Sequence, residues 1–378
     1  MENFVIYNPV KLHFGRNVVE KLSDSLKNTC KRVMLVYGGG SIKKNGIYED
    51  VSGQLEKAGV EVIEFSGIKP NPWVVDVNEA AELGRKENVD AIVAVGGGSV
   101  IDSAKIISIA IPAGHDAWMF MNGEKKPERS IPLYAILTLA ATGTEMNRFA
   151  VLQNNKTKEK NGFGSDYTYP VESFLDPQYT ISVPKDYTGY GIVDLVAHCL
   201  EAYFGEGEAT LSDRFVFSII NEARKYGELL LDDLENYALR EKIMYAATMA
   251  LNNLTAYGRK NGDWGVHAIG HVLSVLYDTP HGATLSIAFP AWLKLNSARL
   301  KDRIEELGRN VFDTKSVDDT IFELENFFAS VESPIRLRDI GLENKEKEIF
   351  DLMVSNGVTG NHIKLTKDDY HKLTELMA

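Results

Sequence analysis

The sequence predicts an N-terminal α/β domain with a mostly parallel, Rossmann-like sheet, followed by an all-α domain. In the first half, short apolar runs alternate with helical stretches, as they do in parallel sheets covered on both faces. From about residue 189 onward helical periodicity dominates, and the change falls near Val183-Pro184, where a proline interrupts the pattern. At 378 residues the chain is longer than one typical core, so we expect two domains, 1–184 and 185–378.

The elements follow in order along the chain. Apolar runs predict strands at 32–37, 60–65, 90–95 and 131–137. The stretches between them predict helices at roughly 45–58, 74–88 and 99–111. In the second half we expect helices at 190–204, 211–230, 237–257, 264–276, 284–297, 301–311, 316–331 and 345–355.

Composition narrows the class of protein. The chain is 44% hydrophobic and 25% charged, which is typical of a soluble globular protein. Its net charge of −12, from 41 basic and 53 acidic side chains, disfavours nucleic acid and anionic membranes as partners. Two cysteines, Cys30 and Cys199, give no disulfide framework, and no signal peptide or membrane-spanning run is visible. We therefore expect a cytoplasmic protein.

Two similar glycine-rich turns stand after predicted strands, Gly38-Gly39-Gly40-Ser41 and Gly96-Gly97-Gly98-Ser99. Glycine lets the backbone approach a phosphate closely, and the N-terminus of the following helix favours the negative charge. The common dinucleotide pattern G-x-G-x-x-G is not met, because Ile101 occupies its third glycine position. A tight turn with close helix packing is the alternative. The repetition after a second strand favours a phosphate site at the carboxyl edge of the sheet.

Residues near the first turn bear on the choice of dinucleotide. NAD sites usually place an acidic residue here, which would repel the 2′-phosphate of NADP. Here no acid is present, Ser41 offers a hydroxyl, and Lys43 and Lys44 follow. We therefore predict a preference for NADP(H), the alternative being that both lysines are ordinary surface charges. Thr138–Glu145, and Asn71 in a Pro-Asn-Pro turn, also follow strands and are weaker candidates for cofactor contacts.

A carboxylate and several histidines form a candidate metal site. Asp194 and His198 stand at i and i+4, and His267 and His271 are spaced in the same way, so each pair shares a helix face. His281 lies in a Pro-His-Gly turn. Carboxylate and imidazole together suit Fe²⁺ or Zn²⁺. Each residue taken alone is more often a satisfied core or surface group, but three histidines within 15 residues favour a site.

One familiar interpretation of the histidine spacing fails. An H-x-x-x-H helix is typical of zinc proteases, but their first histidine is followed by a glutamate that acts as the general base. Ala268 stands at that position, so the sequence lacks the base that proteolysis needs.

With these motifs together, the chain resembles the iron-containing (group III) alcohol dehydrogenases over essentially its whole length. It is most similar to the branch of butanol dehydrogenases and NADPH-dependent aldehyde reductases. The motifs that carry the resemblance are Gly96–Ser99 with Asp102 and Lys105, Asp194-x-x-x-His198, and His267-x-x-x-His271 with Pro280-His281-Gly282. The resemblance implies a homodimeric oxidoreductase that interconverts primary alcohols and aldehydes. It also implies an active site in the cleft between a dinucleotide-binding domain and a helical domain.

The resemblance also assigns roles to residues. It implies a metal site formed by Asp194, His198, His267 and His281. His271 is then not a ligand but lies near the substrate or nicotinamide, and we take it as the candidate proton relay. The implied cofactor-binding residues are Gly38, Gly39, Gly40, Ser41, Asn71, Gly97, Gly98, Ser99, Asp102, Thr138, Thr142 and Lys160. The chain departs from many relatives at Gly360-Asn361-His362-Ile363, where they carry Gly-Asn-Pro-Arg, which leaves the function of this tail open.

The expected chemistry is hydride transfer between the substrate carbon and nicotinamide C4, with the divalent cation acting as a Lewis acid. Aldehyde reduction is the expected physiological direction. Three alternatives stay open: a polyol dehydrogenase acting on glycerol, a lyase similar to dehydroquinate synthase, and a non-enzymatic metal module. The lyase would need several basic groups beside the metal motif, and none adjoins it. A structural zinc site is usually thiolate-rich, and no cysteine stands at a ligand position.

Overall fold

A computed structural model describes residues 1–378 as two compact units. The sheet unit consists of Tyr7–Val183 and Leu234–Met244. The helical unit consists of Met1–Ile6, Pro184–Asp233 and Tyr245–Ala378. The predicted fold class is confirmed, since a parallel sheet with helices occupies the N-terminal part and helices dominate the C-terminal part.

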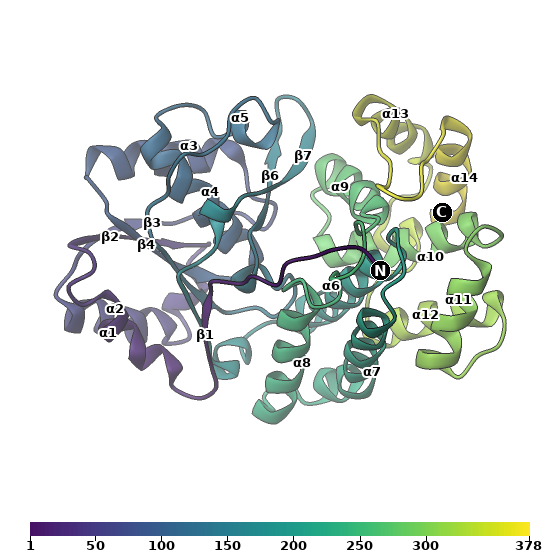
Figure 1. Ribbon diagram of the computed structural model, residues 1–378, viewed down its shortest axis with the longest axis horizontal. Helices are drawn as coiled ribbons and strands as arrows, with labels where there is room; N and C mark the ends of the chain where they lie inside the picture. Colours follow the sequence, from purple (N-terminus) through teal and green to yellow (C-terminus); the bar gives the residue numbers. More distant parts are fainter. The chain divides into compact units, whose positions relative to one another are not determined.

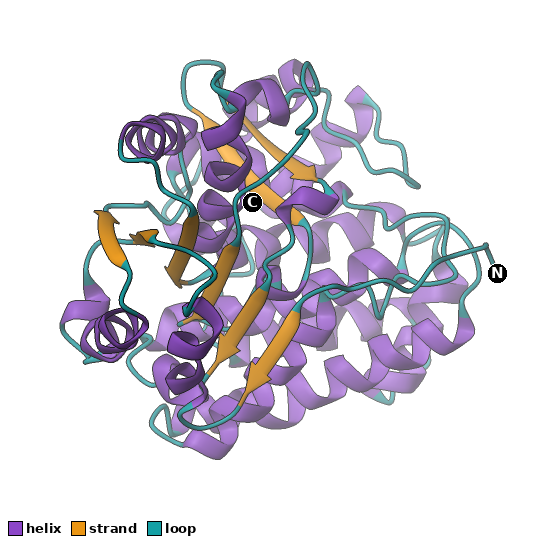
Figure 2. Cartoon of the chain, turned by 60° about the vertical axis from the view of Figure 1, so that its left-hand side comes forward, coloured by secondary structure: helices purple, strands orange, loops and turns teal.

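The sheet unit is built on six parallel strands in the order β1-β8-β5-β4-β2-β3. Figure 1 labels β1 to β4 of this sheet. The bounds are β1 Lys11–Phe14, β2 Arg32–Tyr37, β3 Glu61–Phe65, β4 Ala91–Gly96, β5 Leu133–Leu137 and β8 Glu172–Leu175. The central strands are almost entirely buried because helices cover both faces of the sheet. Figure 2 shows these strands in orange, with helices on either side.

Alternate residues of the strands enter two separate cores. Met34 and Val36 of β2 pack with α3 (Val74–Lys86), α4 (Gly98–Ala113) and α5 (Trp118–Met121). Val33, Leu35 and Tyr37 pack with α1 (Leu22–Leu26) and α2 (Ile47–Ala58) on the other face. This period of two is the one that a strand imposes. The sheet is therefore fixed from both sides, and its carboxyl edge is left for the loops.

A two-stranded antiparallel hairpin, β6 (Phe149–Asn154) and β7 (Glu159–Gly164), was not predicted. Its apolar residues Ala150 and Leu152 are buried against the α3–α4 core. The backbone N–H of Gln153 donates to the carbonyl of Pro72 at 2.8 Å, which ties the hairpin to the loop after β3.

Every helix predicted for the second half is present, although two of them, at 237–257 and 301–311, end earlier than expected. The bounds are α6 Lys185–Tyr203, α7 Thr210–Asp232, α9 Gly265–Tyr277, α10 His281–Asn296, α11 Lys301–Leu307, α12 Val317–Ser330 and α13 Glu346–Asn356. The helix expected at 237–257 is α8 (Tyr237–Ala250), which ends before a run of turns. A final helix, α14 (Lys367–Met377), was not predicted. None of these helices combines the length and apolar character needed to span a bilayer.

Candidate metal centre and cofactor site

The first two candidate metal residues lie on α6, in the helical unit. Asp194 and His198 are one turn apart, and both are at least 95% buried among apolar neighbours such as Val193 and Ala197. The Nε2 atom of His198 lies 3.6 Å from Oδ1 of Asp194. A buried carboxylate and imidazole need compensating polar partners, which these apolar neighbours cannot supply.

Two further elements bring histidines to this face. His267 is the third residue of α9, and His281 is the first residue of α10. The next residue, Gly282, passes so close to the backbone carbonyl of Tyr190 in α6 that a Cβ atom could not fit there. This close approach of α10 to α6 explains how His281 reaches the carboxylate.

The donor atoms of Asp194, His267 and His281 lie within 4.8 Å of one another, and His198 approaches the same carboxylate from α6. The Nε2 atoms of His267 and His281 lie 3.9 and 3.7 Å from Oδ1 of Asp194, close to the 3.6 Å found for His198. Four donors on one tetrahedral ion, with bonds of about 2.1 Å, would stand about 3.4 Å apart. The separations are therefore near those of a ligand set and slightly too long for hydrogen bonds between the same atoms. The arrangement fits a divalent cation better than a simple Asp–His pair.

The protonation states agree with this fit. Burial, and to a lesser extent the neighbouring His267, lowers the pKa of His198 well below its usual value. His198 is therefore neutral near pH 7, which is the form in which imidazole binds a metal.

Sequence reasoning missed Glu201, which completes the surroundings of His267. Its Oε1 atom accepts the Nδ1–H of His267 at 2.8 Å and the backbone N–H of the same residue at 2.9 Å. Its other oxygen accepts the backbone N–H of Trp264. Burial raises the pKa of Glu201 to about 8, although backbone N–H groups oppose the shift. The available signal was its spacing, seven residues after Asp194, which places it on the same face of α6.

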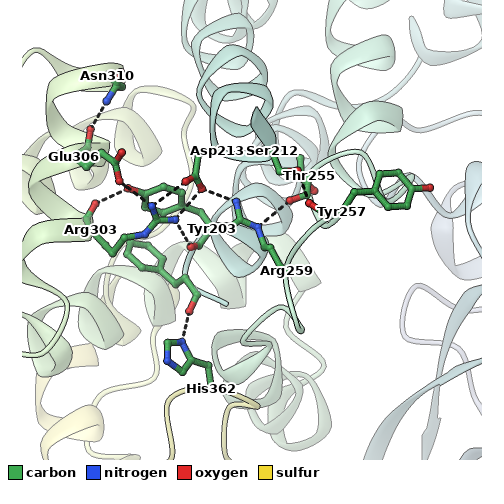
Figure 3. Close-up of polar contacts among 11 residues, drawn as sticks. Tyr203, Ser212, Asp213, Thr255, Tyr257, Arg259, Arg303, Glu306, Asn310 and His362 are labelled. Carbon is green, nitrogen blue, oxygen red and sulfur yellow. Dashed lines mark hydrogen bonds and ion pairs between the residues drawn. The ribbon is translucent and has the colours of Figure 1, made fainter. Parts of the chain in front are cut away.

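The carboxyl end of α6 is held by a network of charged groups (Figure 3). Asp213 of α7 accepts hydrogen bonds from Arg259 at 2.5 Å and from Arg303 at 2.8 and 3.0 Å. Arg303 also donates to the carbonyl of Tyr203 at 2.7 Å and lies over its ring. Burial opposes ionisation of Asp213, but the two guanidinium groups prevail and lower its pKa. The network fixes the last turn of the helix that carries Asp194 and His198.

The tail that departs from the family pattern also supports this region. The carboxylate of Asp263 accepts the backbone N–H groups of His362 at 3.0 Å and Ile363 at 2.6 Å. The same carboxylate accepts the N–H of Gly265, at the start of α9, at 3.2 Å. The tail loop is therefore attached to the segment that leads to His267.

The candidate relay residue His271 lies one turn after His267 on α9 and is partly exposed. Its ring centroid is 5.7 Å from that of His281, at an interplanar angle of 37°. The ring therefore lies beside a candidate ligand while keeping some contact with solvent.

The candidate cofactor residues lie in the sheet unit and follow neighbouring parallel strands. Gly38–Ser41 follows β2, Asn71 follows β3, Gly97–Ser99 follows β4, and Thr138 and Thr142 follow β5. Because the strands are parallel, all of these segments meet at the carboxyl edge of the sheet, where open α/β sheets bind their ligands. The structure therefore places these predicted cofactor residues at one edge of the sheet.

The second glycine turn forms the start of α4. Gly97 caps the helix, which begins at Gly98, so the first-turn N–H groups point out of this edge. A Cβ atom on Gly98 would lie 2.6 Å from the methyl group of Thr142, so only glycine fits there. The Ser99 hydroxyl donates to the carbonyl of Pro70. The turn therefore has a backbone suited to an anion and little space for side chains.

Lys160 and Asn71 contact each other, although they are far apart in sequence. Lys160 lies on β7, and its Nζ atom donates to Oδ1 of Asn71 at 2.8 Å. Lys160 therefore lies at this edge of the sheet because the hairpin, which was not predicted, places it beside Asn71.

Asp102 has partners within the fold. Its Oδ1 atom accepts the hydroxyl of Thr144 at 2.6 Å, and its Oδ2 atom accepts the backbone N–H of Val151 at 2.9 Å. Burial raises the pKa of Asp102, although Lys105 and these hydrogen bonds oppose the shift. In this arrangement Asp102 holds the loop after β5 and the hairpin against α4.

Of the two lysines near the first turn, one is already neutralised. The Nζ atom of Lys43 lies 3.2 Å from a carboxylate oxygen of Glu64, which also accepts the hydroxyl groups of Tyr37 and Tyr48. Ser41 and Lys44 are exposed. The charge that remains for a 2′-phosphate is therefore that of Lys44 rather than Lys43.

Comparison with known proteins identifies the family of the chain. Residues 9–177 match the family model described as iron-containing alcohol dehydrogenase, and residues 188–377 match the C-terminal model of the same family. The chain is 41% identical to a probable NADH-dependent butanol dehydrogenase of Bacillus subtilis over 98% of each chain. It is 33% identical to an NADPH-dependent aldehyde reductase of Escherichia coli over 99% of each. The crystal structure of an NADH-dependent butanol dehydrogenase from Thermotoga maritima superposes with a TM-score of 0.96 at 38% identity, covering 100% of this chain and 99% of that one.

Proposed function

The chain belongs to the iron-containing alcohol dehydrogenase family, and from this premise we propose that it is a metal-dependent enzyme that reduces small aldehydes to primary alcohols with NADP(H). One observation carries the proposal: three histidine Nε2 atoms lie within 3.9 Å of a single buried carboxylate oxygen of Asp194. Relatives named as butanol dehydrogenases and an aldehyde reductase support the substrate class.

In this proposal Asp194, His198, His267 and His281 hold the divalent cation, Fe²⁺ or Zn²⁺. When bound, the cation supplies Lewis-acid stabilisation of charge on the substrate oxygen. The backbone of Gly97, Gly98 and Ser99 binds the pyrophosphate, and Asn71, Thr138, Thr142 and Lys160 position the rest of the cofactor. His271 exchanges the proton that accompanies hydride transfer with solvent, as its partial exposure allows. We also propose that the cofactor site belongs to the predicted domain 1–184 and the metal site to the predicted domain 185–378.

The preference for NADP(H) rests on the Gly38–Ser41 turn. This turn has no acidic side chain, and its exposed Ser41 and nearby Lys44 suit a 2′-phosphate. Relatives include enzymes named as NADH-dependent and one named as NADPH-dependent, so the family alone leaves the choice open. Asp102, which has partners inside the fold, is better placed to support the cofactor loop than to bind the cofactor itself.

We further propose a cytoplasmic homodimer. The large side chains of Val5, Ile6 and Tyr7 are exposed, and a second copy would cover apolar surface of this kind. Light scattering on the purified protein would give the number of subunits, and a monomer would contradict the proposal.

The first experiment tests metal dependence and chemistry together. Protein stripped by a chelator should lose the oxidation of NADPH by butanal, and addition of Fe²⁺ or Zn²⁺ under anaerobic conditions should restore it. Asp194→Ala should reduce the bound metal, measured by elemental analysis, to a trace. Full activity in the stripped protein, or undiminished metal in Asp194→Ala, would contradict the proposal. A glycerol oxidation rate well above that with butanol would favour the polyol dehydrogenase instead.

The second experiment tests the cofactor. The ratio of kcat/KM for NADPH to that for NADH should exceed one. Lys44→Ala should lower it by about 10-fold, since one ion pair in a partly exposed site contributes about 1–2 kcal/mol. Lys43→Ala, whose ammonium group is neutralised by Glu64, is the matched control and should change the ratio less. A wild-type ratio below one would contradict the NADP(H) preference.

A further inference from the structure

One face of α6 carries three polar side chains that all relate to the candidate metal centre. Asp194, His198 and Glu201 follow one another at intervals of four and three residues, so they line up along the helix. Asp194 and His198 are themselves candidate metal ligands. Glu201 is not; its carboxylate lies against the far side of the His267 ring.

We propose that Glu201 is a positioning residue for the metal, acting through His267. This inference rests on the proposed metal site and adds a residue to it. The carboxylate fixes which nitrogen of His267 carries the proton, and it fixes where the ring stands.

The tautomer follows from the hydrogen bonds. The groups that contact the Glu201 carboxylate are the backbone N–H groups of Trp264 and His267 and the Nδ1 atom of the His267 ring. The Oε1 atom accepts the backbone N–H of His267, so it is an acceptor toward Nδ1 as well, and the proton of the neutral ring resides on Nδ1. The lone pair of Nε2 is then available on the side of Asp194.

The ring position follows from the same carboxylate. By accepting two backbone N–H groups at the start of α9, Glu201 also caps this helix from a neighbouring one. Trp264, the residue before α9, has a φ of 63°, so the chain enters the helix through a left-handed turn. One buried group therefore holds both the backbone and the ring of His267. Removing it would let the ligand ring rotate.

The test is metal affinity, measured apart from activity. Glu201→Gln keeps the size of the side chain but turns an amide N–H₂ toward N–H donors. Co²⁺ affinity, measured by competition with a chromogenic chelator, should fall 10- to 100-fold, as typically follows loss of such a carboxylate. The visible absorption bands of the Co²⁺ protein should also change, because the geometry of the ligand set changes. Glu325→Gln is the matched control, since Glu325 is a buried carboxylate of the same unit paired with Lys294 and Arg336.

The outcomes separate the possible roles. Glu325→Gln should leave Co²⁺ affinity and spectrum as in the wild type. If Glu201→Gln lowers the free energy of unfolding of the metal-free protein but leaves affinity and spectrum unchanged, Glu201 is merely structural and the inference is overturned. If Glu201→Gln does not fold, Glu201→Asp, which keeps the charge but is shorter, is measured against the same two results. Failure of the metal site itself would appear differently, as an Asp194→Ala variant with wild-type Co²⁺ affinity.

Discussion

Lys105 is completely buried in α4, and oxygen atoms surround its ammonium group. It donates to the hydroxyl of Thr144 at 2.7 Å, to the carbonyls of Asn147 and Phe149 at 2.8 and 2.7 Å, and to the side chain of Asn147 at 3.1 Å. Thr144 in turn donates to Asp102. These contacts hold the segment after β5 in one conformation, and that segment carries the cofactor candidates Thr138 and Thr142.

This burial makes stability depend on pH. Burial lowers the pKa of Lys105 to about 8, against 10.5 for the ordinary group, although Asp102 and Glu145 oppose the shift. Between these values the unfolded chain holds the proton and the folded chain does not, so stability rises with pH and is lost as pH falls through about 8. From pH 8 to 10, the wild type should gain about 2 kcal/mol in the free energy of unfolding relative to Lys105→Met. Urea unfolding measures this difference.

The comparison needs a lysine that makes no such contacts. Lys156→Met, in the exposed turn between β6 and β7, serves as that control. Parallel pH profiles for the wild type and Lys105→Met would refute the prediction.

His271 gives a second prediction at the level of one residue. As a proton relay outside the ligand set, it can be replaced without loss of metal. His271→Ala should keep the wild-type metal content and lose about 100-fold in kcat, the lower range for general acid–base catalysis. Elemental analysis and steady-state kinetics measure the two quantities on one preparation. An unchanged kcat would remove the relay role and leave His271 as a neighbour of His281.

Residue spacing singled out Asp194 with His198 and His267 with His271, because i, i+4 pairs on a helix need no knowledge of the rest of the fold. The choice of His281 rather than His271 as a ligand came only from the resemblance to the family.

Residue spacing did not reveal Glu201, whose importance depends on α9 lying beside α6. It also gave no reason to separate Lys43 from Lys44, because the partner of Lys43, Glu64, comes from another strand. Contacts between segments that are distant in the chain could not be predicted from the sequence alone.

Among the helices, α6 is the one whose last turn is held by a buried network of charged side chains. Asp213, Arg259 and Arg303 hold its last turn, and all three are partly or fully buried. Removing the carboxylate would leave two guanidinium groups without their shared partner.

We therefore expect Asp213→Asn to lower the free energy of unfolding by about 3–5 kcal/mol, the usual cost of breaking a buried ion pair from one side. Chemical unfolding of the metal-free protein measures the loss. Asp351→Asn is the control, because the Lys347–Asp351 pair lies one helical turn apart on an exposed surface and should change stability by less than about 0.5 kcal/mol. Similar losses in the two variants would contradict a special role for the network.

The strands that sequence predicted are the ones with long apolar runs, β2 to β5. The two that it missed at the other side of the sheet, β1 and β8, have only four residues each and pair with each other. Their stability comes from long-range pairing rather than from local pattern. The hairpin was hidden in the same way, since β7 reads Glu-Lys-Asn-Gly-Phe-Gly and only its partner strand is apolar.

At the scale of the whole molecule, the family relationship extends over nearly the entire chain, so fold and enzyme class are those of an alcohol dehydrogenase. Length and the change in pattern predicted two domains, and two compact units are present. The sequence pattern could not reveal that each unit includes a short segment that is distant in the chain from the rest of the unit. Met1–Ile6 belongs with the C-terminal helices, and Leu234–Met244 belongs with the sheet.

This interleaving has a consequence for folding on the ribosome. The sheet unit still lacks its last segment when residue 183 has been synthesised, and it is complete only after residue 244 has emerged. The helical unit includes the first six residues, whose partners Tyr257 and Gly258 exist only after residue 258 has been synthesised. Neither unit is therefore a single stretch of polypeptide that could be cut out and expected to fold with all its contacts. The sheet unit has all its segments first, and the helical unit has all of its own only when synthesis ends.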